Sequence, residues 1–280
     1  MDNKSKIILI SGPTASGKSF FAVEIAKKIN GEIINADSMQ VYKQLKILTA
    51  RPNKIDQKNI KHHLYGMIDL NKSFSTGQWL KLTIKKIKEI KKRGKIPILV
   101  GGTGLYFQSL INGLVKIPKI PLKVRNKVRL IQKNLGQNKF YKELLKLDSN
   151  VQNKFNPNDV QRSIRAYEIK LHTKVSMYEW LKKTNSVFYE SQFLKLYVNF
   201  DRKELIKRIW FRTIKMLEDG VIQEVKKFNT KKIKKDSSVN KVIGLNELKQ
   251  YLKNQITLDE AKELIAIRTR QYAKRQATWA

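Results

Sequence analysis

An eight-residue glycine loop, set between a strand-like run and a helix-like run, constrains the fold of this chain more than any other feature. Residues 12–19 read GPTASGKS and satisfy the pattern G-x-x-x-x-G-K-[ST] without deviation. The apolar run KIILIS precedes the loop, and KSFFAVEIAKKIN follows it with apolar residues at helical spacing. In such a strand–loop–helix unit the backbone amides converge on an anion. The sequence therefore predicts a phosphate-binding loop.

Two side chains of this loop add specific chemistry. Lys18 supplies a positive point charge, and the Ser19 hydroxyl is placed to bind Mg²⁺. We expect the whole loop to contact the phosphate groups of a ligand. The expected contacts are Gly12, Pro13, Thr14, Ala15, Ser16, Gly17, Lys18 and Ser19.

Strand-like and helix-like runs alternate through the first hundred residues. EIINAD (32–37) and KIPILVGGT (95–103) read as buried strands, and the amphipathic run GQWLKLTIKKIKEIKKRG lies between them. This alternation predicts an α/β fold with a parallel sheet flanked by helices, similar to that of P-loop NTPases. Ligands of such sheets bind beyond the carboxyl ends of the strands. The glycine loop and the loops that follow the runs 32–37 and 95–103 are expected to lie there.

The pattern changes after Gly113. Helical periodicity then dominates until FLKLYVNFD (193–201), where a strand pattern returns and further helices follow. We therefore expect a catalytic core domain made of residues 1–116 and 194–280, with an inserted all-helical domain at 117–193.

Composition narrows the class of protein and its partners. The chain has 58 Lys and Arg against 23 Asp and Glu, a formal net charge of +35, which favours a nucleic-acid partner. A general preference for lysine at exposed positions is an alternative source of this charge. No apolar run approaches the roughly 20 residues of a membrane helix, and the start lacks the features of a secretory signal. These observations predict a soluble cytoplasmic protein without a membrane partner.

The acid that usually completes a nucleotide-hydrolysing site is missing. Such enzymes carry an Asp at the end of another apolar strand, where it holds the metal, but here IPILV runs into Gly101 and Gly102. The bound phosphate is therefore interpreted as a leaving group. A small-molecule kinase and a basic RNA-binding protein with a vestigial loop remain alternatives.

Five motifs follow one another along nearly the whole chain. They are GPTASGKS (12–19), ADSMQVYK (36–43), LVGGTGLY (99–106), NPNDVQRSIRAYEI (156–169) and TRQYAKRQATW (269–279). In this order they resemble the signatures of bacterial tRNA dimethylallyltransferases. The resemblance implies transfer of a dimethylallyl group from dimethylallyl diphosphate to the exocyclic amine of the adenine beside the anticodon, in tRNAs that read codons beginning with U. It also implies Mg²⁺ as cofactor, and a monomer suffices for this mechanism.

The resemblance also assigns catalytic roles. It places the active-site arginine at Arg212 and the catalytic threonine at Thr103. Asp37 ends a strand and matches the base that accepts the amine proton, which is a sensible requirement because an aromatic amine is a poor nucleophile. Asp37 has a competing interpretation as a residue that caps the following turn. Arg212 has a competing interpretation as one more exposed charge on a helix.

The resemblance further implies a set of tRNA contacts. Because a stacked base cannot reach the cavity, the adenine must be flipped out of its stack. The residues expected to contact the base or the anticodon stem-loop are Asp37, Ser38, Met39, Gln40, Thr103, Arg125, Gln161, Arg162, Ser163, Ile164 and Arg165.

Other conspicuous residues are interpreted as structural. The adjacent pair His62–His63 has no carboxylate cluster near it in the sequence, and Trp79 fits a helix packing face. One loop departs from the family pattern: Leu48 stands where glycine is usual and Arg51 where lysine is common, so we expect a stiffer loop on the amine-binding side.

Overall fold

The structure, a computed structural model, describes residues 6–233 and 237–279. The chain divides into two compact units, a core unit (Met1–Ile111 and Phe188–Ala280) and a helical unit (Asn112–Val187). The boundaries expected from the sequence, at residues 117 and 193, lie a few residues later along the chain. The second boundary differs because the segment before the returning strand, which includes the short turn Glu190–Gln192, belongs to the core unit.

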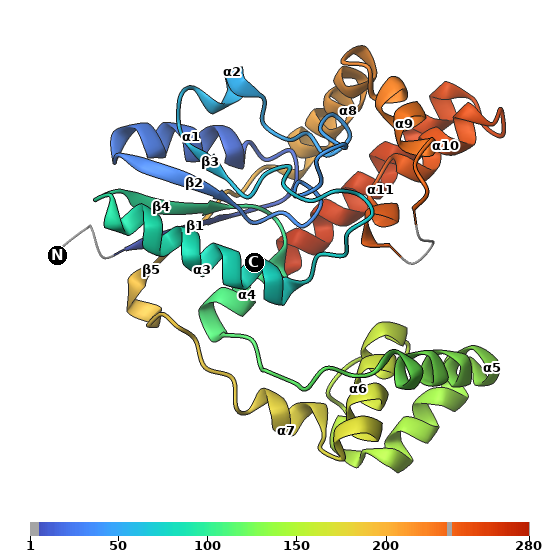
Figure 1. Cartoon of the computed structure of the whole chain (residues 1–280). Helices are drawn as coiled ribbons and strands as arrows, with labels where there is room; N and C mark the ends of the chain where they lie inside the picture. The colour runs from blue at the N-terminus through green and yellow to red at the C-terminus, as the bar shows by residue number, and fades with distance from the viewer. Residues whose placement is uncertain (1–5, 234–236, 280) are drawn as a thin grey trace. The chain divides into compact units, whose positions relative to one another are not determined.

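The core unit contains a parallel sheet. Its strands are β1 (Ile7–Ser11), β2 (Gly31–Asn35), β3 (His62–His63), β4 (Ile96–Val100) and β5 (Phe193–Tyr197). Their spatial order is β3-β2-β4-β1-β5, and every pairing is parallel (Figure 1). Because the strands are parallel, the loops that follow β1, β2 and β4 leave from the same edge of the sheet. The α/β class with a parallel sheet flanked by helices is thus confirmed.

The helices of the core unit cover this sheet and form a helical layer towards the C-terminus. They are α1 (Lys18–Lys28), α2 (Lys54–Gln57), α3 (Thr76–Lys92), α4 (Gly104–Asn112), α8 (Arg202–Glu218), α9 (Val221–Asn229), α10 (Leu245–Leu252) and α11 (Leu258–Trp279). In this layer α11 packs against both α8 and α10.

Side chains of the strands alternate between two packed faces. Ile8 and Ile10 of β1 pack with Ala22 of α1, whereas Leu9 packs on the other face with Trp79 of α3. Figure 1 shows α1 and α3 on opposite sides of the sheet. Since both faces are covered, the strands are continuously apolar instead of alternating, as buried parallel strands are.

The helical unit has its own small core. Its helices are α5 (Leu122–Leu147), α6 (Val160–Thr173) and α7 (Met177–Leu181), with a 3-10 turn at Ser149–Val151. Tyr141 and Leu144 of α5 pack with Ala166 of α6. Gly136 has a φ of 70° and interrupts α5, which is a kink that an L residue would resist. No strand occurs among the described residues of this unit, in agreement with the helical pattern.

The strand β3 was not predicted from the sequence. It is only two residues long, and it lies at the edge of the sheet, paired with β2. His63 Nε2 lies 2.7 Å from Glu32 Oε2, and Arg93 Nη2 donates to the same oxygen at 2.6 Å. Burial by itself raises the pKa of Glu32, but the hydrogen bonds from Arg93 and His63 lower it to about 2. His63 thus has a partner in the sheet itself.

No helix within the described ranges is both long and apolar enough to cross a membrane.

Candidate active site

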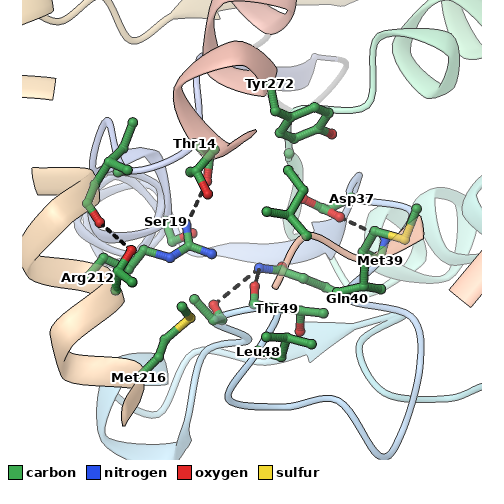
Figure 2. A pocket seen from close by; sticks show the side chains of 18 of the residues that line it. Thr14, Ser19, Asp37, Met39, Gln40, Leu48, Thr49, Arg212, Met216 and Tyr272 are labelled. Carbon is green, nitrogen blue, oxygen red and sulfur yellow. Dashed lines mark hydrogen bonds between the residues drawn. The ribbon is translucent and has the colours of Figure 1, made fainter. Parts of the chain in front are cut away.

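A cavity of about 670 Å³ lies beyond the carboxyl ends of β1, β2 and β4 in the core unit. The glycine loop, the segment after β2, and helices α8 and α11 all contribute to its lining. Figure 2 shows Thr14, Ser19 and Arg212 on one side of this cavity and Asp37 on the other. The predicted residues that line it are Thr14, Ala15, Gly17, Lys18, Ser19, Asp37, Met39, Gln40 and Arg212.

The glycine loop has the backbone of an anion cradle. Gly12, Ala15 and Gly17 have positive φ values of 153°, 66° and 86°. Helix α1 begins directly after Gly17, and no side chain caps it. The first amides of a helix have no intrahelical acceptor, so they are available to an anion in the cavity. Ser16, by contrast, is buried, and its hydroxyl has no hydrogen-bond partner among the described residues.

Lys18 adds an unusually acidic ammonium group to this cradle. Its Nζ donates to the carbonyl oxygen of Pro13 at 3.0 Å, within the loop itself. Burial lowers the pKa of Lys18 to about 8; the Asp37 carboxylate opposes this shift, and the Arg212 cation adds to it. An arriving polyphosphate would reverse the effect, because it stabilises the charged form.

Arg212 connects α8 to the glycine loop. Its Nη1 donates to Thr14 Oγ1 at 2.6 Å (Figure 2). Burial lowers the pKa of Arg212, but a guanidinium remains charged in proteins. One turn before it on α8, Arg208 also lines the cavity, and a Cβ placed on Gly17 would lie 3.3 Å from Arg208 Nη1. Two cations therefore face the region where a phosphate group would bind.

Asp37 caps a turn with one of its carboxylate oxygens and leaves the other one available. Its Oδ1 accepts a hydrogen bond from the Met39 amide at 2.8 Å, and Asn35 Oδ1 accepts one from the Asp37 amide at 2.8 Å. The turn interpretation is therefore correct for Oδ1. Within residues 6–233 and 237–279 no hydrogen bond engages Oδ2, so this oxygen of the half-buried carboxylate is open to a ligand in the cavity.

Thr103 supports the segment after β2 and is absent from the residues that line the cavity, as far as the chain is described. Its Oγ1 accepts from the Ser38 amide at 2.9 Å and lies 3.3 Å from Ser38 Oγ. The backbone amide of Thr103 donates to the carbonyl of Ala36 at 3.2 Å. These contacts hold Ser38, and hence its neighbour Asp37, in place.

The loop that departs from the family pattern is held by many polar contacts. The Glu224 carboxylate accepts from the backbone amides of Lys46, Ile47 and Leu48 at 2.7–2.8 Å. Gln40 Nε2 donates to the carbonyl of Thr49 at 3.0 Å (Figure 2). Leu48 is buried and lines the cavity. The bulk of Leu48 thus forms part of the cavity wall.

The remaining predicted tRNA contacts lie in the helical unit. Arg125 at the start of α5 and Arg165 on α6 both approach the buried Glu168, with N–O distances of 3.8 Å and 3.5 Å. Gln161 and Arg162 are exposed, and Ile164 is half-buried. Ser163 is fully buried, and its hydroxyl donates to the Asp159 carbonyl at 2.8 Å. The same hydroxyl accepts from Gln137 Nε2 of α5 at 3.0 Å, so the Ser163 side chain joins α6 to α5 and is turned away from solvent.

The comparisons with known proteins agree with this geometry. The sequence model of a family described as IPP transferase matches residues 40–280. The chain belongs to the IPP transferase family. It is 73% identical, over its whole length and 90% of the relative, to a tRNA dimethylallyltransferase of Pelagibacter ubique (strain HTCC1062). It is 44% identical to the same enzyme of Rickettsia massiliae (strain Mtu5), with 99% of this chain and 78% of that relative aligned.

Solved structures of the IPP transferase family resemble this chain closely. A eukaryotic dimethylallyltransferase acting on tRNA matches with a TM-score of 0.84 and 33% identity, which covers 98% of this chain and 69% of that one. A tRNA isopentenylpyrophosphate transferase from Staphylococcus epidermidis matches with a TM-score of 0.67 and 36% identity, over 98% of this chain and 89% of that one. The family expectation made from the five motifs is therefore confirmed.

The donor set of the cavity suits a magnesium ion that is held largely by substrate. Ser19 and Asp37 line the same cavity, but no group of three or more His, Cys, Asp or Glu residues clusters anywhere in 6–233 or 237–279. Mg²⁺ commonly keeps several waters and binds through few protein groups plus substrate phosphates. The residues present fit an ion of this kind.

Sequence reasoning missed two residues of α11 that belong to the site. Tyr272 lines the cavity, and burial together with the Asp37 carboxylate raises its pKa well above the usual value. Gln276 contacts the glycine loop directly. Both lie in the family motif TRQYAKRQATW, and their i, i+4 spacing places them on one helix face. That spacing was the available signal.

Proposed function

We propose that this chain transfers a dimethylallyl group from dimethylallyl diphosphate to the exocyclic N6 amine of a tRNA adenine. The target is the adenine on the 3′ side of the anticodon in tRNAs that read codons beginning with U, and the products are N6-isopentenyladenosine and diphosphate. The observation that carries this proposal is a single cavity whose lining includes both an anion cradle and the Asp37 carboxylate.

The reaction follows from the placement of these groups. The adenine amine attacks the allylic carbon and forms the new C–N bond. The C–O bond between that carbon and the diphosphate breaks, and its electron pair stays on the diphosphate oxygen. Asp37 accepts the proton that the amine loses. Loop amides, Lys18 and Arg212 stabilise the negative charge that grows on the leaving group, so they act most strongly in the transition state.

Mg²⁺, held through Ser19 and the diphosphate oxygens, would supply further charge neutralisation at the leaving group. Thr14 would be aligned for the same anion, because Arg212 fixes its hydroxyl at 2.6 Å. This arrangement does not favour the kinase alternative, since β4 ends at Val100 and is followed by Gly101 where a metal-holding acid would stand.

The remaining partners follow from the chemistry. A flipped adenine must enter the cavity on the side of Asp37, next to Met39 and Gln40, while the diphosphate occupies the glycine loop. One chain provides all of these groups, so we propose a monomer as the active species. Because tRNA is the substrate, we propose that the protein works in the cytoplasm.

Incubation with radiolabelled dimethylallyl diphosphate, Mg²⁺ and unmodified tRNA tests the proposal. We expect label in the RNA at a single adenosine and no consumption of ATP supplied in parallel. A folded protein that leaves the tRNA unlabelled, or that consumes ATP with a small acceptor, contradicts it. Labelling that is lost in Lys18→Ala excludes a vestigial loop.

A further inference from the structure

The side-chain amide of Gln276 joins two loops of the site that are far apart in the sequence. Gln276 lies on α11 and is buried. Its Oε1 accepts a hydrogen bond from the backbone amide of Thr14 at 2.7 Å. Its Nε2 donates to the carbonyl oxygen of Gly102 at 3.0 Å. One side chain thus contacts both the glycine loop and the loop between β4 and α4.

These two bonds require a neutral primary amide. An acceptor and a donor must sit on one planar group, one facing an N–H and the other a carbonyl. A carboxylate would keep the bond to Thr14, but its second, negatively charged oxygen would face the partly negative carbonyl oxygen of Gly102 and repel it. An apolar side chain would leave a buried amide and a buried carbonyl without partners.

The glycine loop depends on support from outside. Thr14 is held at two points, because Gln276 binds its amide and Arg212 binds its hydroxyl. The next residue, Ala15, has a φ of 66°, a conformation that L residues rarely adopt. Such a conformation persists only where the surroundings enforce it.

On the other side, Gln276 acts close to the proposed base. A Cβ on Gly102 would collide with the Gln276 amide, so this position must be glycine for the contact to form. Thr103, the next residue, accepts from the Ser38 amide, and Ser38 follows Asp37. A continuous set of bonded groups therefore runs from Thr14 through Gln276, Gly102 and Thr103 to the segment of Asp37.

We propose that Gln276 is a positioning residue that holds the glycine loop in register with the loop of Thr103. The inference rests on the proposed prenyl transfer. Through these two bonds the residue aligns the leaving group with the attacking amine, and it acts through Thr14 and Gly102 instead of touching substrate.

The test uses Gln276→Glu, Gln276→Leu and, as a matched control, Gln271→Leu, which alters an exposed glutamine of the same helix. At pH 8 and saturating substrates, we expect kcat of both Gln276 variants to fall on the order of tenfold to a hundredfold. The KM for tRNA should stay within about twofold, and the control should match wild type.

A pH profile separates positioning from packing. Burial raises the pKa of a carboxyl group, and the protonated form of Gln276→Glu can donate to Gly102 and accept from Thr14 as the amide does. The ratio of the Gln276→Glu rate to the wild-type rate should therefore rise as the pH falls from 8 to 6. The ratio for Gln276→Leu should stay constant.

The rates and pH profiles of the two Gln276 variants either support or contradict the positioning role. A ratio for Gln276→Glu that does not change with pH, or a kcat near wild type in Gln276→Leu, overturns the proposal. If circular dichroism shows that lost folding accounts for the lost activity in both variants, the role is structural and the proposal also fails. Wild-type protein that does not label tRNA refutes the proposed function separately.

Discussion

Asp37 performs two tasks with its two carboxylate oxygens, and substitution can separate them. Asn keeps an oxygen to accept from the Met39 amide, as Asp37 Oδ1 does at 2.8 Å, but it cannot take a proton. We expect Asp37→Asn to lower the single-turnover rate about 10²- to 10⁴-fold with little change in tRNA affinity. Asp259→Asn, at an exposed helix position, serves as control. A near-wild-type rate in Asp37→Asn would eliminate this residue as the base.

Lys18 should impose a limit on activity at high pH. Its pKa is lowered to about 8, so in the free protein the ammonium is present below pH 8 and is lost as the pH rises through that value. We expect kcat/KM for dimethylallyl diphosphate to fall above pH 8 by about tenfold per pH unit. The bound diphosphate raises the Lys18 pKa, so kcat should decline only at higher pH.

The control for this profile is Lys18→Arg, whose guanidinium stays charged throughout the range. Its kcat/KM should be lower at pH 7 because the cation is shaped differently, but the decline above pH 8 should disappear. A decline of equal steepness in Lys18→Arg would assign the titration to another group.

At the scale of the elements, the edge of the sheet depends on a buried acid. Glu32 of β2 is 1% exposed and accepts from His63 of β3 and Arg93 at the end of α3, with Lys95 at 3.5 Å. We expect Glu32→Gln to lower the free energy of unfolding by about 3 kcal/mol at pH 7, since it leaves the Arg93 and Lys95 cations without their partner. Denaturant titration followed by circular dichroism measures this value.

The pH dependence of that loss has a definite sign. The folded pKa of Glu32, about 2, lies below its unfolded value, so the stabilisation is present above about pH 4.5 and is lost as the pH falls towards 2. The wild-type and Glu32→Gln proteins should therefore converge in stability under acid. Glu24→Gln, which removes the partly exposed carboxylate of a surface ion pair on α1, should change little at any pH. A constant difference between wild type and Glu32→Gln would contradict the assigned pKa.

For the whole molecule, the net charge of +35 raises the question of how many cations contact RNA. Neutralised phosphates release counterions, so each true contact adds about one to the slope of log affinity against log salt. We expect Arg165→Ala to weaken tRNA binding and to reduce this slope by about one, with kcat at saturating tRNA unchanged. Filter binding between 50 and 200 mM salt measures the slope.

Lys146→Ala is the matched control, because Lys146 is an exposed cation of the same helical unit that pairs with Glu143. It should leave the slope as it is. Equal slope changes in the two variants would mean that the basic surface acts through its overall charge. Arg165 would then make no phosphate contact that distinguishes it from other exposed cations.

The sequence by itself determined the glycine loop, four of the five strands found in the described part of the chain, and the family of this protein. These features are local: a buried parallel strand is apolar along its own length, and GPTASGKS gathers its amides within eight residues. Only the tertiary structure decided that β3 joins the sheet edge, that Oδ1 of Asp37 is committed to a turn, and that Gln276 lies between Thr14 and Gly102. Such partners are separated by up to 262 residues, and chain topology, which local periodicity does not encode, brings them together.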